Sequence, residues 1–370
     1  MHILLATGIF PPAIGGPATY STKLAEEFLK LGHRVTVVTY GRKLMIEDPR
    51  LSIVFVPKSG TVLSRWRGYR RALRKYGADA DAVIALSSVS TGVPLLLSGL
   101  RKPKKILRLG GDFFWERYTD GGGMKSLREW YGSSFGFWKL LNTSFMEAIL
   151  RSFDVLVYST DFQRKIHEHA YAELPKSIVI ENAASPHLTP NPSLTLRLGR
   201  GEHASPHNPF RLLFMGRFVG FKNLPVLLDA VAAMPDVSLT LVGCGPLEGR
   251  LRARAGLLGL GSRVEFRPPV AGEEKRRTFL EHDVLILPSV TEISPNVALE
   301  AISEGLPVLL TDETGLKPEG VMHLRPLRTV SDIVRAVREY MTRSNGDERR
   351  VPVRTYAQVA QDWVQLIASL

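Results

Sequence analysis

The chain alternates short apolar runs with segments of helical spacing. His2–Thr7 and Arg34–Tyr40 are apolar runs with the length of buried strands, and between them Ala18–Leu31 places its apolar side chains on one helical face. Strand, helix and strand within about 40 residues predict a βαβ unit and therefore a parallel sheet. Further runs of strand length follow at Ile53–Val56, Ala82–Leu86, Ile106–Leu109, Val155–Tyr158 and Ile178–Ile180.

The alternation stops at Ala183–Pro209, a segment with five prolines and little periodicity. The same pattern then resumes, in this order along the chain: strand Arg211–Met215, helix Leu224–Met234, strand Ser238–Val242, helix Leu247–Leu258, strand Val264–Arg267, strand Val284–Leu287, helix Ser294–Gly305 and strand Pro307–Thr311.

Two halves of this kind predict an α/β protein with two doubly wound, Rossmann-like domains. We assign residues 1–185 to the first domain, 186–209 to a linker and 210–354 to the second domain. The last helix, residues 355–370, carries Trp363 on an apolar face and needs a surface to pack on.

Length and composition fit this organisation, because 370 residues match two domains of common size. The single cysteine, Cys244, excludes an intramolecular disulfide and favours a reducing compartment, so we expect a cytoplasmic location. Residues 82–100 carry no charge, but their serines, glycines and proline predict a strand, a loop and a short helix rather than a membrane span. No secretory signal is recognised at the N-terminus. We therefore expect a protein that is soluble or attached to a surface from one side.

The net charge of +12 is unevenly distributed. Residues 1–180 hold 26 basic and 15 acidic residues, a net charge of +11, which leaves +1 for the rest of the chain. Such asymmetry indicates a polyanionic partner such as nucleic acid or anionic lipid.

A basic segment at residues 61–77 contains six basic residues and no acidic one. On a helix, its aromatic and leucine side chains fall on one face and its arginines occupy much of the remainder. Two interpretations stay open: a packed helix with a solvated basic face, or an interfacial helix on the anionic cytoplasmic face of a membrane. The candidate membrane or acceptor surface consists of Trp66, Arg67, Arg70, Arg71 and Arg74.

Two loops that follow predicted strands could bind phosphate. Gly15 and Gly16 precede a predicted helix, whose free backbone N–H groups and dipole favour an anion. Arg217 and Lys222 follow the first strand of the second half, where two cations could clamp a diphosphate. A plain turn and solvated charges are the alternatives. The dinucleotide fingerprint and the P-loop motif are both absent.

Glu292 and Glu300 flank the start of a predicted helix. Pro295 suits the first turn, which leaves Glu292 in the preceding loop and Glu300 one to two turns inside the helix. Two carboxylates can accept hydrogen bonds from sugar hydroxyls, while the helix N-terminus binds phosphate, so the segment suits a nucleotide sugar. Helix capping and a solvated surface are the alternatives. The candidate residues at the helix start are Ser294, Pro295, Asn296 and Val297.

No metal site is predicted. Asp79-Ala80-Asp81 has the spacing of a D-x-D metal motif, but it precedes an apolar strand, where an acidic turn is common. His167 and His169 are two residues apart, so they do not share a helical face, and we expect a solvated helix surface there.

Taken in order, these pieces resemble the retaining glycosyltransferases of family 4, which have the GT-B fold. The resemblance implies two Rossmann-like domains facing a central cleft, with a C-terminal helix that crosses back to the first domain. Its Glu292-to-Glu300 part is close to the family variant E-G-S-P-N-V-x-L-E of the E-x7-E motif. The resemblance rests on Gly15-Gly16, Ile180-Glu181-Asn182, Gly216-Arg217 with Lys222, Val242-Gly243-Cys244-Gly245-Pro246, and Glu292 with Glu300.

The resemblance also implies a role for each piece. The first domain would face the acceptor and the second would bind the nucleotide sugar. Gly16 would approach the donor diphosphate or sugar, and Arg217 and Lys222 would bind the diphosphate. Glu292 would meet the donor sugar as a catalytic residue, and Glu300 would hold the ribose hydroxyls.

The sequence departs from the family pattern at two places. Ile293 stands where the family usually has glycine. Many members carry a histidine after a strand of the first domain, where this chain has Gly110, Gly111 and Asp112. Asp112 is therefore a catalytic candidate, with helix capping as the alternative.

The implied reaction transfers a sugar, with retention, from a nucleotide-diphosphate sugar to a hydroxyl of a lipid-linked or cell-envelope glycan. No cofactor and no metal are expected, because fixed cations and helix N-termini can stabilise the leaving diphosphate. Two alternatives remain: a non-hydrolysing sugar-nucleotide epimerase, which can share this architecture, and a basic nucleic-acid-binding protein. Only the charge favours the latter, and since no nucleic-acid module is recognised, nucleic acid is not expected as a partner.

Overall fold

The computed structural model describes residues 1–11, 13, 15–41, 50–133, 136–184, 209–317, 322–342 and 353–370. The predicted linker, residues 186–209, lies outside these ranges up to residue 208. The chain divides into two compact units. Unit 1 comprises Met1–Trp115, Arg128–Asn182 and Arg354–Leu370, and unit 2 comprises Glu116–Leu127 and Ala183–Val353.

Unit 1 contains a seven-stranded parallel sheet in the order β3-β2-β1-β4-β5-β6-β7. The central strands are the predicted apolar runs, and β1 and β4 are fully buried because helices cover both faces of the sheet. The strand order reverses between β1 and β4, which makes the carboxyl ends of these two strands the expected ligand-binding edge. The strands are β1 (His2–Thr7), β2 (Arg34–Tyr40), β3 (Leu51–Val56), β4 (Ala82–Ala85), β5 (Lys104–Leu109), β6 (Val155–Tyr158) and β7 (Ser177–Val179).

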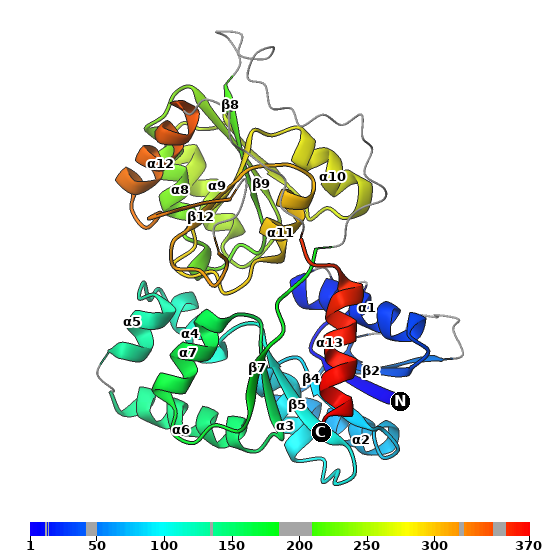
Figure 1. The fold of residues 1–370 in the computed structure, drawn as a ribbon. Coiled ribbons are helices and arrows are strands. Elements are labelled where there is room, and N and C mark those ends of the chain that lie inside the picture. The colour runs from blue at the N-terminus through cyan, green and yellow to red at the C-terminus, as the bar shows by residue number, and fades with distance from the viewer. Residues whose placement is uncertain are drawn as a thin grey trace. The chain divides into compact units, whose positions relative to one another are not determined.

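The helices of unit 1 follow the strands as connections (Figure 1). The chain moves in opposite directions along the sheet from β1 to β2 and from β3 to β4, so right-handed crossovers place α1 and α2 on opposite faces. The uncharged residues 82–100 form β4, a short π-helical turn and α3, and no described helix is long and apolar enough to cross a membrane. The helices of this half of the chain are α1 (Gly16–Lys30), α2 (Val62–Tyr76), α3 (Val93–Leu96), α4 (Phe113–Asp120), α5 (Leu127–Gly132), α6 (Phe137–Arg151) and α7 (Asp161–Ala170), of which α4 from Glu116 onward and the first residue of α5 belong to unit 2.

The C-terminal helix α13 (Tyr356–Ala368) packs on α1, as Figure 1 shows for the red and dark blue helices. A capping box of Thr355 and Gln358 starts the helix. Trp363 is fully buried, and its Nε1 donates a hydrogen bond to the Tyr20 hydroxyl at 2.9 Å. This contact confirms the prediction that the last helix crosses back to the first domain.

Unit 2 contains a six-stranded parallel sheet in the order β10-β9-β8-β11-β12-β13, which confirms the second Rossmann-like half. Its strand order reverses between β8 and β11. The strands are β8 (Phe210–Met215), β9 (Val237–Val242), β10 (Val264–Arg267), β11 (Val284–Leu287), β12 (Val308–Thr311) and β13 (Met322–Arg325), and the helices are α8 (Leu224–Ala232), α9 (Glu248–Leu257), α10 (Gly272–Leu280), α11 (Asn296–Ser303) and α12 (Val330–Thr342).

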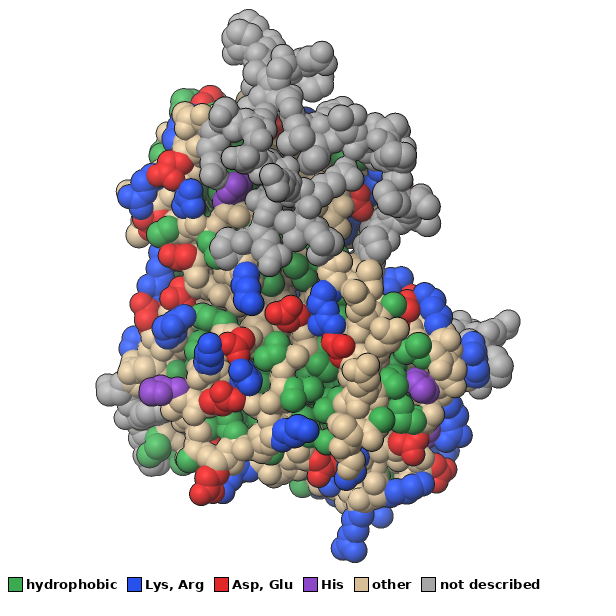
Figure 2. Space-filling view, in the orientation of Figure 1, with side chains coloured by type: hydrophobic (Ala, Val, Ile, Leu, Met, Phe, Trp, Pro, Cys, Tyr) green, Lys and Arg blue, Asp and Glu red, His purple; other side chains and the backbone are tan. Residues whose placement is uncertain are grey.

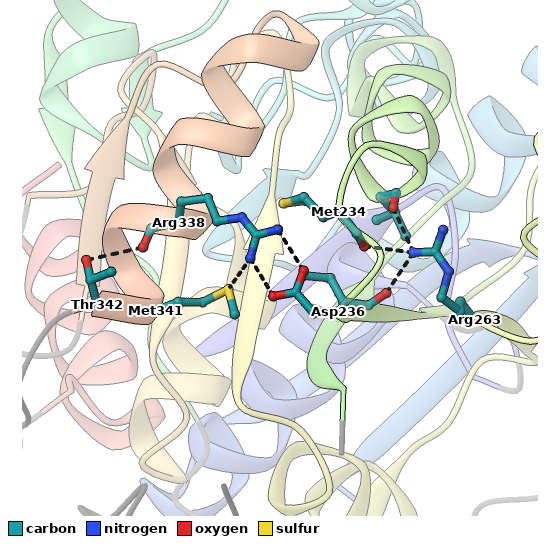
Figure 3. A network of polar contacts seen from close by, with 8 residues as sticks. Met234, Asp236, Arg263, Arg338, Met341 and Thr342 are labelled. Atoms are coloured by element: carbon teal, nitrogen blue, oxygen red, sulfur yellow. Dashed lines mark hydrogen bonds and ion pairs between the residues drawn. The ribbon is translucent and has the colours of Figure 1, made fainter. Parts of the chain in front are cut away.

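Polar contacts at the amino ends of β9 and β10 hold unit 2 together (Figure 3). Arg338 of α12 binds both carboxylate oxygens of Asp236, and this pairing lowers the pKa of Asp236 below its usual range. Arg263 donates to the carbonyl oxygens of Val231, Met234 and Val237 at 2.8–3.1 Å. Since ligands bind at the carboxyl ends of such strands, this network has a structural role.

Candidate active site

Two glycine turns pack against each other at the carboxyl ends of β8 and β9. A Cβ on Gly243, whose φ is +150°, would lie 1.9 Å from the carbonyl oxygen of Gly216, and a Cβ on Gly245 would lie 2.4 Å from that of Phe218. The Phe218 N–H donates to the Cys244 carbonyl at 2.9 Å. Only glycine allows this backbone-to-backbone contact, which fixes the turn that carries Arg217.

Lys222 and Glu292 meet across the point where the strand order of unit 2 reverses. Lys222 belongs to the short 3-10 turn Gly220–Lys222 after β8, and Glu292 follows β11. Their side chains form an ion pair and are 13% and 6% exposed. Ser289 donates to the same Oε1 of Glu292 at 2.6 Å. The structure therefore brings two predicted donor-site residues together at the edge where α/β sheets bind ligands.

Backbone pairing fixes the position of Glu292. Its N–H donates to the Glu313 carbonyl at 2.9 Å, and its carbonyl accepts from the Gly315 N–H at 3.1 Å. Together with the bridge to Thr314, these bonds hold the loop before α11 as a strand-like segment. Ile293, at the position where the family usually has glycine, is buried.

Helix α11 is shorter than the predicted helix Ser294–Gly305. Pro295 is the N-cap, with φ −72° and ψ 108°, and therefore precedes the helix instead of opening it. Glu300 lies in the second turn and forms an ion pair with Lys275 of α10, with the two side chains 17% and 20% exposed. Both carboxylates of the E-x7-E motif are thus paired with a lysine. The other predicted residues at this helix start are Ser294, Asn296 and Val297, all half-buried.

Arg217 differs from Lys222 because its side chain is exposed. Within the described ranges this side chain makes no hydrogen bond, ion pair or ring contact, so it can bind a ligand without breaking a protein contact. In unit 2, the predicted diphosphate site therefore consists of an exposed arginine and a lysine already paired with glutamate.

The glycine loop of unit 1 lies at the carboxyl end of β1. Gly15 has a φ of +155° and is the N-cap of α1, Gly16 opens the helix, and no side chain caps the first turn. A Cβ on Gly15 would lie 3.2 Å from Cδ1 of Ile9. The free N-terminus of α1 thus lies at the edge where the strand order of unit 1 reverses, and binding of an anion there stays a prediction.

Asp112 is a buried carboxylate whose two oxygens have partners in unit 1. Oδ1 accepts a hydrogen bond from the Trp115 N–H at 2.9 Å, and Oδ2 accepts from the Tyr131 hydroxyl at 2.7 Å and pairs with His167 Nε2 at 3.1 Å. Burial raises the pKa of Asp112. The hydrogen bond and charge of His167, together with the hydrogen bonds from Tyr131 and Trp115, lower this pKa by more, so the net effect is a pKa below the usual value. The side chain caps the first turn of α4, an arrangement that favours capping over direct contact with a substrate.

Helix α2 buries Tyr69 and Leu73 and exposes Arg67, Arg71 and Arg74, while Trp66 and Arg70 are half-buried. Its first turn also exposes Val62 and Leu63, at 50% and 63%. In Figure 2, several lysine and arginine side chains lie at the lower right of unit 1, where Figure 1 places α2. The helix therefore presents both basic and apolar groups to its surroundings.

The sequence analysis missed the residues that hold the candidate side chains. Lys275 lies 25 positions before Glu300 without any motif that links them, and Ser289 and Tyr131 lack a distinctive spacing. The expected solvated surface at His167 is wrong, because that side chain is 1% exposed and contacts Asp112, whereas His169 is exposed. The acidic turn before β4 is confirmed, since Asp81 accepts a hydrogen bond from the His2 N–H at 2.7 Å.

Two family models match the chain, one in each half. Residues 14–187 match the model described as "Glycosyltransferase Family 4". Residues 209–343 match the model described as "Glycosyl transferases group 1".

A curated relative and two solved structures show what the chain is similar to. The lipopolysaccharide core biosynthesis glycosyltransferase LpsE of Rhizobium meliloti (strain 1021) is 37% identical over 105 residues, which are 28% of this chain and 30% of LpsE. The first curated relatives are matched over only 30% of their length. Sucrose-phosphate synthase from Thermosynechococcus elongatus superposes with a TM-score of 0.80 at 18% identity, covering 100% of this chain and 98% of that chain.

The Anabaena protein HepE, solved in complex with UDP and glucose, superposes with a TM-score of 0.75 at 15% identity, covering 100% of this chain and 99% of that chain. Both solved structures share two parallel-sheet Rossmann-like domains with this chain, which establishes the predicted GT-B fold. The two family models match the chain in the order of its two sheets, one model in each half. The chain is therefore a member of the family 4 glycosyltransferases.

Proposed function

We propose that the protein transfers a sugar, with retention of configuration, from a nucleoside-diphosphate sugar to a hydroxyl acceptor. The observation that carries the proposal is the Lys222–Glu292 pair at the reversal point of the unit 2 sheet, with Glu300 eight residues further on. HepE, which has the same fold, was solved with UDP and glucose, which supports a nucleotide sugar as the donor.

The charges at this edge suit a leaving diphosphate. Negative charge develops on the diphosphate as the glycosidic bond breaks, and preorganised positive groups stabilise it without reorganising. The Arg217 side chain is exposed and has no partner among the described residues, and Lys222 is fixed by Glu292. In this proposal the two side chains supply the positive charge, so the reaction needs neither a metal ion nor a cofactor.

The two glutamates have separate roles in the proposal. Glu292 contacts the donor sugar, and its paired Lys222 contacts the adjoining phosphate. Glu300 accepts hydrogen bonds from the ribose hydroxyls, and its ion pair with Lys275 fixes its position in the second turn of α11. We assign donor binding to residues 210–354, and the acceptor side to residues 1–185 with residues 355–370. In unit 1, Gly15 and Gly16 offer the free N-terminus of α1 to an anionic group.

We further propose a lipid-linked or cell-envelope glycan as the acceptor, approached from the cytoplasmic face of a membrane. The support is the exposed basic and apolar surface of α2 and the similarity to LpsE, whose name places it in lipopolysaccharide core biosynthesis. A cytoplasmic location agrees with the exposed free thiol of Cys244, which persists in a reducing compartment.

Calorimetry with UDP, GDP and ADP, followed by turnover with the matching nucleotide sugars, tests the donor proposal. Proton NMR of the product then measures the anomeric configuration, which should equal that of the donor. Failure to bind any nucleoside diphosphate would contradict the function. Epimerisation of the donor without an acceptor would instead identify an epimerase, and steep salt-dependent binding of DNA or RNA would identify a nucleic-acid-binding protein.

A further inference from the structure

A segment from the first half of the chain belongs to unit 2. Glu116–Leu127 contains the last five residues of α4 and ends at the first residue of α5. We call it the strap. Its connections to the rest of unit 2 include three hydrogen bonds: Asp120 Oδ1 accepts from the Gly220 N–H at 3.3 Å, the Leu127 N–H donates to Thr291 Oγ1 at 3.0 Å, and the Met124 carbonyl accepts from Arg328 Nη2 at 3.4 Å.

Two of these attachments adjoin the Lys222–Glu292 pair. Gly220 is the first residue of the three-residue turn that ends at Lys222, and Thr291 directly precedes Glu292. The strap therefore contacts both chain segments that present the ion pair.

The contact at Gly220 is between backbones. A Cβ added there would lie 2.2 Å from the Thr119 carbonyl oxygen and 3.1 Å from the Asp120 nitrogen, so any other residue would push the strap away from the turn. At the other attachment, Thr291 is 1% exposed and Leu127 is fully buried, so their hydrogen bond is shielded from water.

The far end of the Lys222 turn is held as well. Asn223 adopts a left-handed conformation with a φ of +56°, and its side chain donates to the carbonyl oxygens of Leu327 and Arg328 at 3.3 and 3.2 Å. Arg328 in turn donates to Met124 of the strap. The turn is thus fixed at both ends, once by the strap directly and once through Arg328.

We propose that the strap is a positioning device that sets the place of Lys222 and Glu292 for the donor, with Gly220 and Thr291 as positioning residues. A charged side chain on a short turn loses effectiveness when its support shifts by about 1 Å, since binding and transition-state contacts depend on that geometry. The inference rests on the proposed function, because it assumes that this ion pair meets the donor.

Gly220→Ala displaces the strap, and Gly249→Ala is its matched control, because a Cβ on Gly249 meets nothing within 4 Å. We expect Gly220→Ala to weaken binding of the preferred nucleoside diphosphate, chosen from UDP, GDP and ADP, by about tenfold, and Gly249→Ala to leave it unchanged. Binding is measured by calorimetry at a temperature where circular dichroism shows that both variants are folded. Equal affinity in Gly220→Ala and the wild type overturns the proposal.

Thr291→Val and Thr291→Ser test the second attachment independently. Valine has the shape of threonine without the hydroxyl that accepts from Leu127, whereas serine keeps that hydroxyl. We expect Thr291→Val to lower kcat for the nucleotide sugar about tenfold with a smaller change in KM, because Glu292 meets the sugar, and Thr291→Ser to recover most of the rate. Equal rates in the two variants would overturn a positioning role for Thr291.

If Gly220→Ala fails to fold, Asp120→Ala and Asp120→Asn replace it, since Asp120 is exposed. Asparagine keeps the Oδ1 acceptor and should bind like the wild type, whereas alanine should bind about threefold more weakly. Tighter binding in both variants would show that only the negative charge matters, which contradicts positioning. If the wild type binds none of the three nucleoside diphosphates, the proposed function is wrong. If the wild type binds one of them, but no more tightly than the strap variants do, only the positioning role of the strap is wrong.

Discussion

At the scale of single residues, the two glutamates of the E-x7-E motif are each held by a lysine from another element. Glu292 pairs with Lys222 and Glu300 pairs with Lys275. Removing one partner of a largely buried pair leaves the other charge without compensation, so these side chains contribute to stability as well as to ligand binding. Arg217 is exposed and has no such pair in the described part of the chain, so substituting it should change ligand binding without changing stability.

The first prediction uses this difference. Arg217→Ala should lower turnover by about 30- to 1000-fold, equivalent to about 2 to 4 kcal/mol of transition-state stabilisation, without changing Tm. Lys222→Ala should lower turnover similarly but also destabilise the fold by about 3 kcal/mol, because Glu292 stays buried. Steady-state kinetics and thermal unfolding measure the two effects.

The control is the double variant Lys222→Ala with Glu292→Gln, which removes both charges and should recover part of the lost stability. Near wild-type turnover in both single variants would show that neither cation serves the diphosphate. An unchanged Tm in Lys222→Ala would show that Glu292 gains nothing from its lysine.

The second prediction separates the two glutamates. Glu300→Gln should weaken binding of the nucleoside diphosphate, because Glu300 is assigned to the ribose. Glu292→Gln should lower turnover with little change in that affinity, because it is assigned to the sugar and glutamine still accepts from Ser289. Calorimetry with the nucleoside diphosphate and single-turnover kinetics distinguish them. Equal losses of affinity in the two variants would rule out this division of roles.

At the scale of elements, the sequence predicted the strands better than the contacts between them. Val83 and Leu213 belong to apolar runs that are buried on both faces, and such runs are visible in one chain because their pattern is local. The β13 segment Met322–Arg325 is half polar and was not predicted. Pairs such as Lys222 with Glu292, 70 positions apart, depend on the tertiary fold, which the local pattern does not encode. The sequence motifs located both glutamates and Lys222, but nothing in the sequence indicated the two ion pairs or pointed to Lys275.

The third prediction concerns the cap of α4. The pKa of Asp112 is lower in the folded protein than the unfolded value of about 3.9, so its ionised form stabilises the fold above that pH and the stabilisation is lost as the pH falls. Asp112→Asn does not titrate at this site. The difference in Tm between the wild type and Asp112→Asn should therefore be largest above about pH 5 and shrink toward pH 3.

Asp154→Asn serves as the control, because Asp154 is an exposed carboxylate that accepts from the Lys105 N–H. Its effect on Tm should be smaller than that of Asp112→Asn at every pH. If Asp112 is a cap and not a catalytic group, the folded Asp112→Asn variant should keep a kcat within about threefold of the wild type, since asparagine also caps helices. A loss of turnover by more than about 100-fold at unchanged Tm would instead support a catalytic Asp112.

At the scale of the whole molecule, the excess charge lies in residues 1–180, with a net charge of +11. Part of it is used inside unit 1: the Arg108 guanidinium lies 3.9 Å from the centroid of the Tyr20 ring and donates to Asn182. The arginines of α2 are different, because the side chains of Arg67, Arg71 and Arg74 are exposed and make no hydrogen bond or ion pair in the described ranges. These three arginines lie on the same helix as the exposed Val62 and Leu63. Their positive charge is therefore available to bind an anion outside the protein.

The last prediction tests whether that anion is a membrane surface. Each basic residue near an anionic bilayer contributes about 1 kcal/mol, so reversing three charges should reduce binding by more than 100-fold. We choose Arg67→Glu, Arg71→Glu and Arg74→Glu and leave Arg70 unchanged, because its Nε is buried. Wild-type protein should sediment with anionic liposomes at low salt, and the triple variant should not, although it should still bind the nucleoside diphosphate.

The matched control reverses three exposed basic residues of unit 2: Arg250, Arg277 and Lys317. It changes the net charge by the same amount, so a general electrostatic effect would reduce liposome binding equally in both triple variants. A site on α2 predicts that only the first variant loses binding. Replacing Leu63 with serine should then weaken binding further at high salt, because screening removes the electrostatic contribution and leaves the apolar one. If wild-type protein does not sediment with anionic liposomes at low salt, the membrane proposal for α2 is wrong, and a soluble acceptor is favoured.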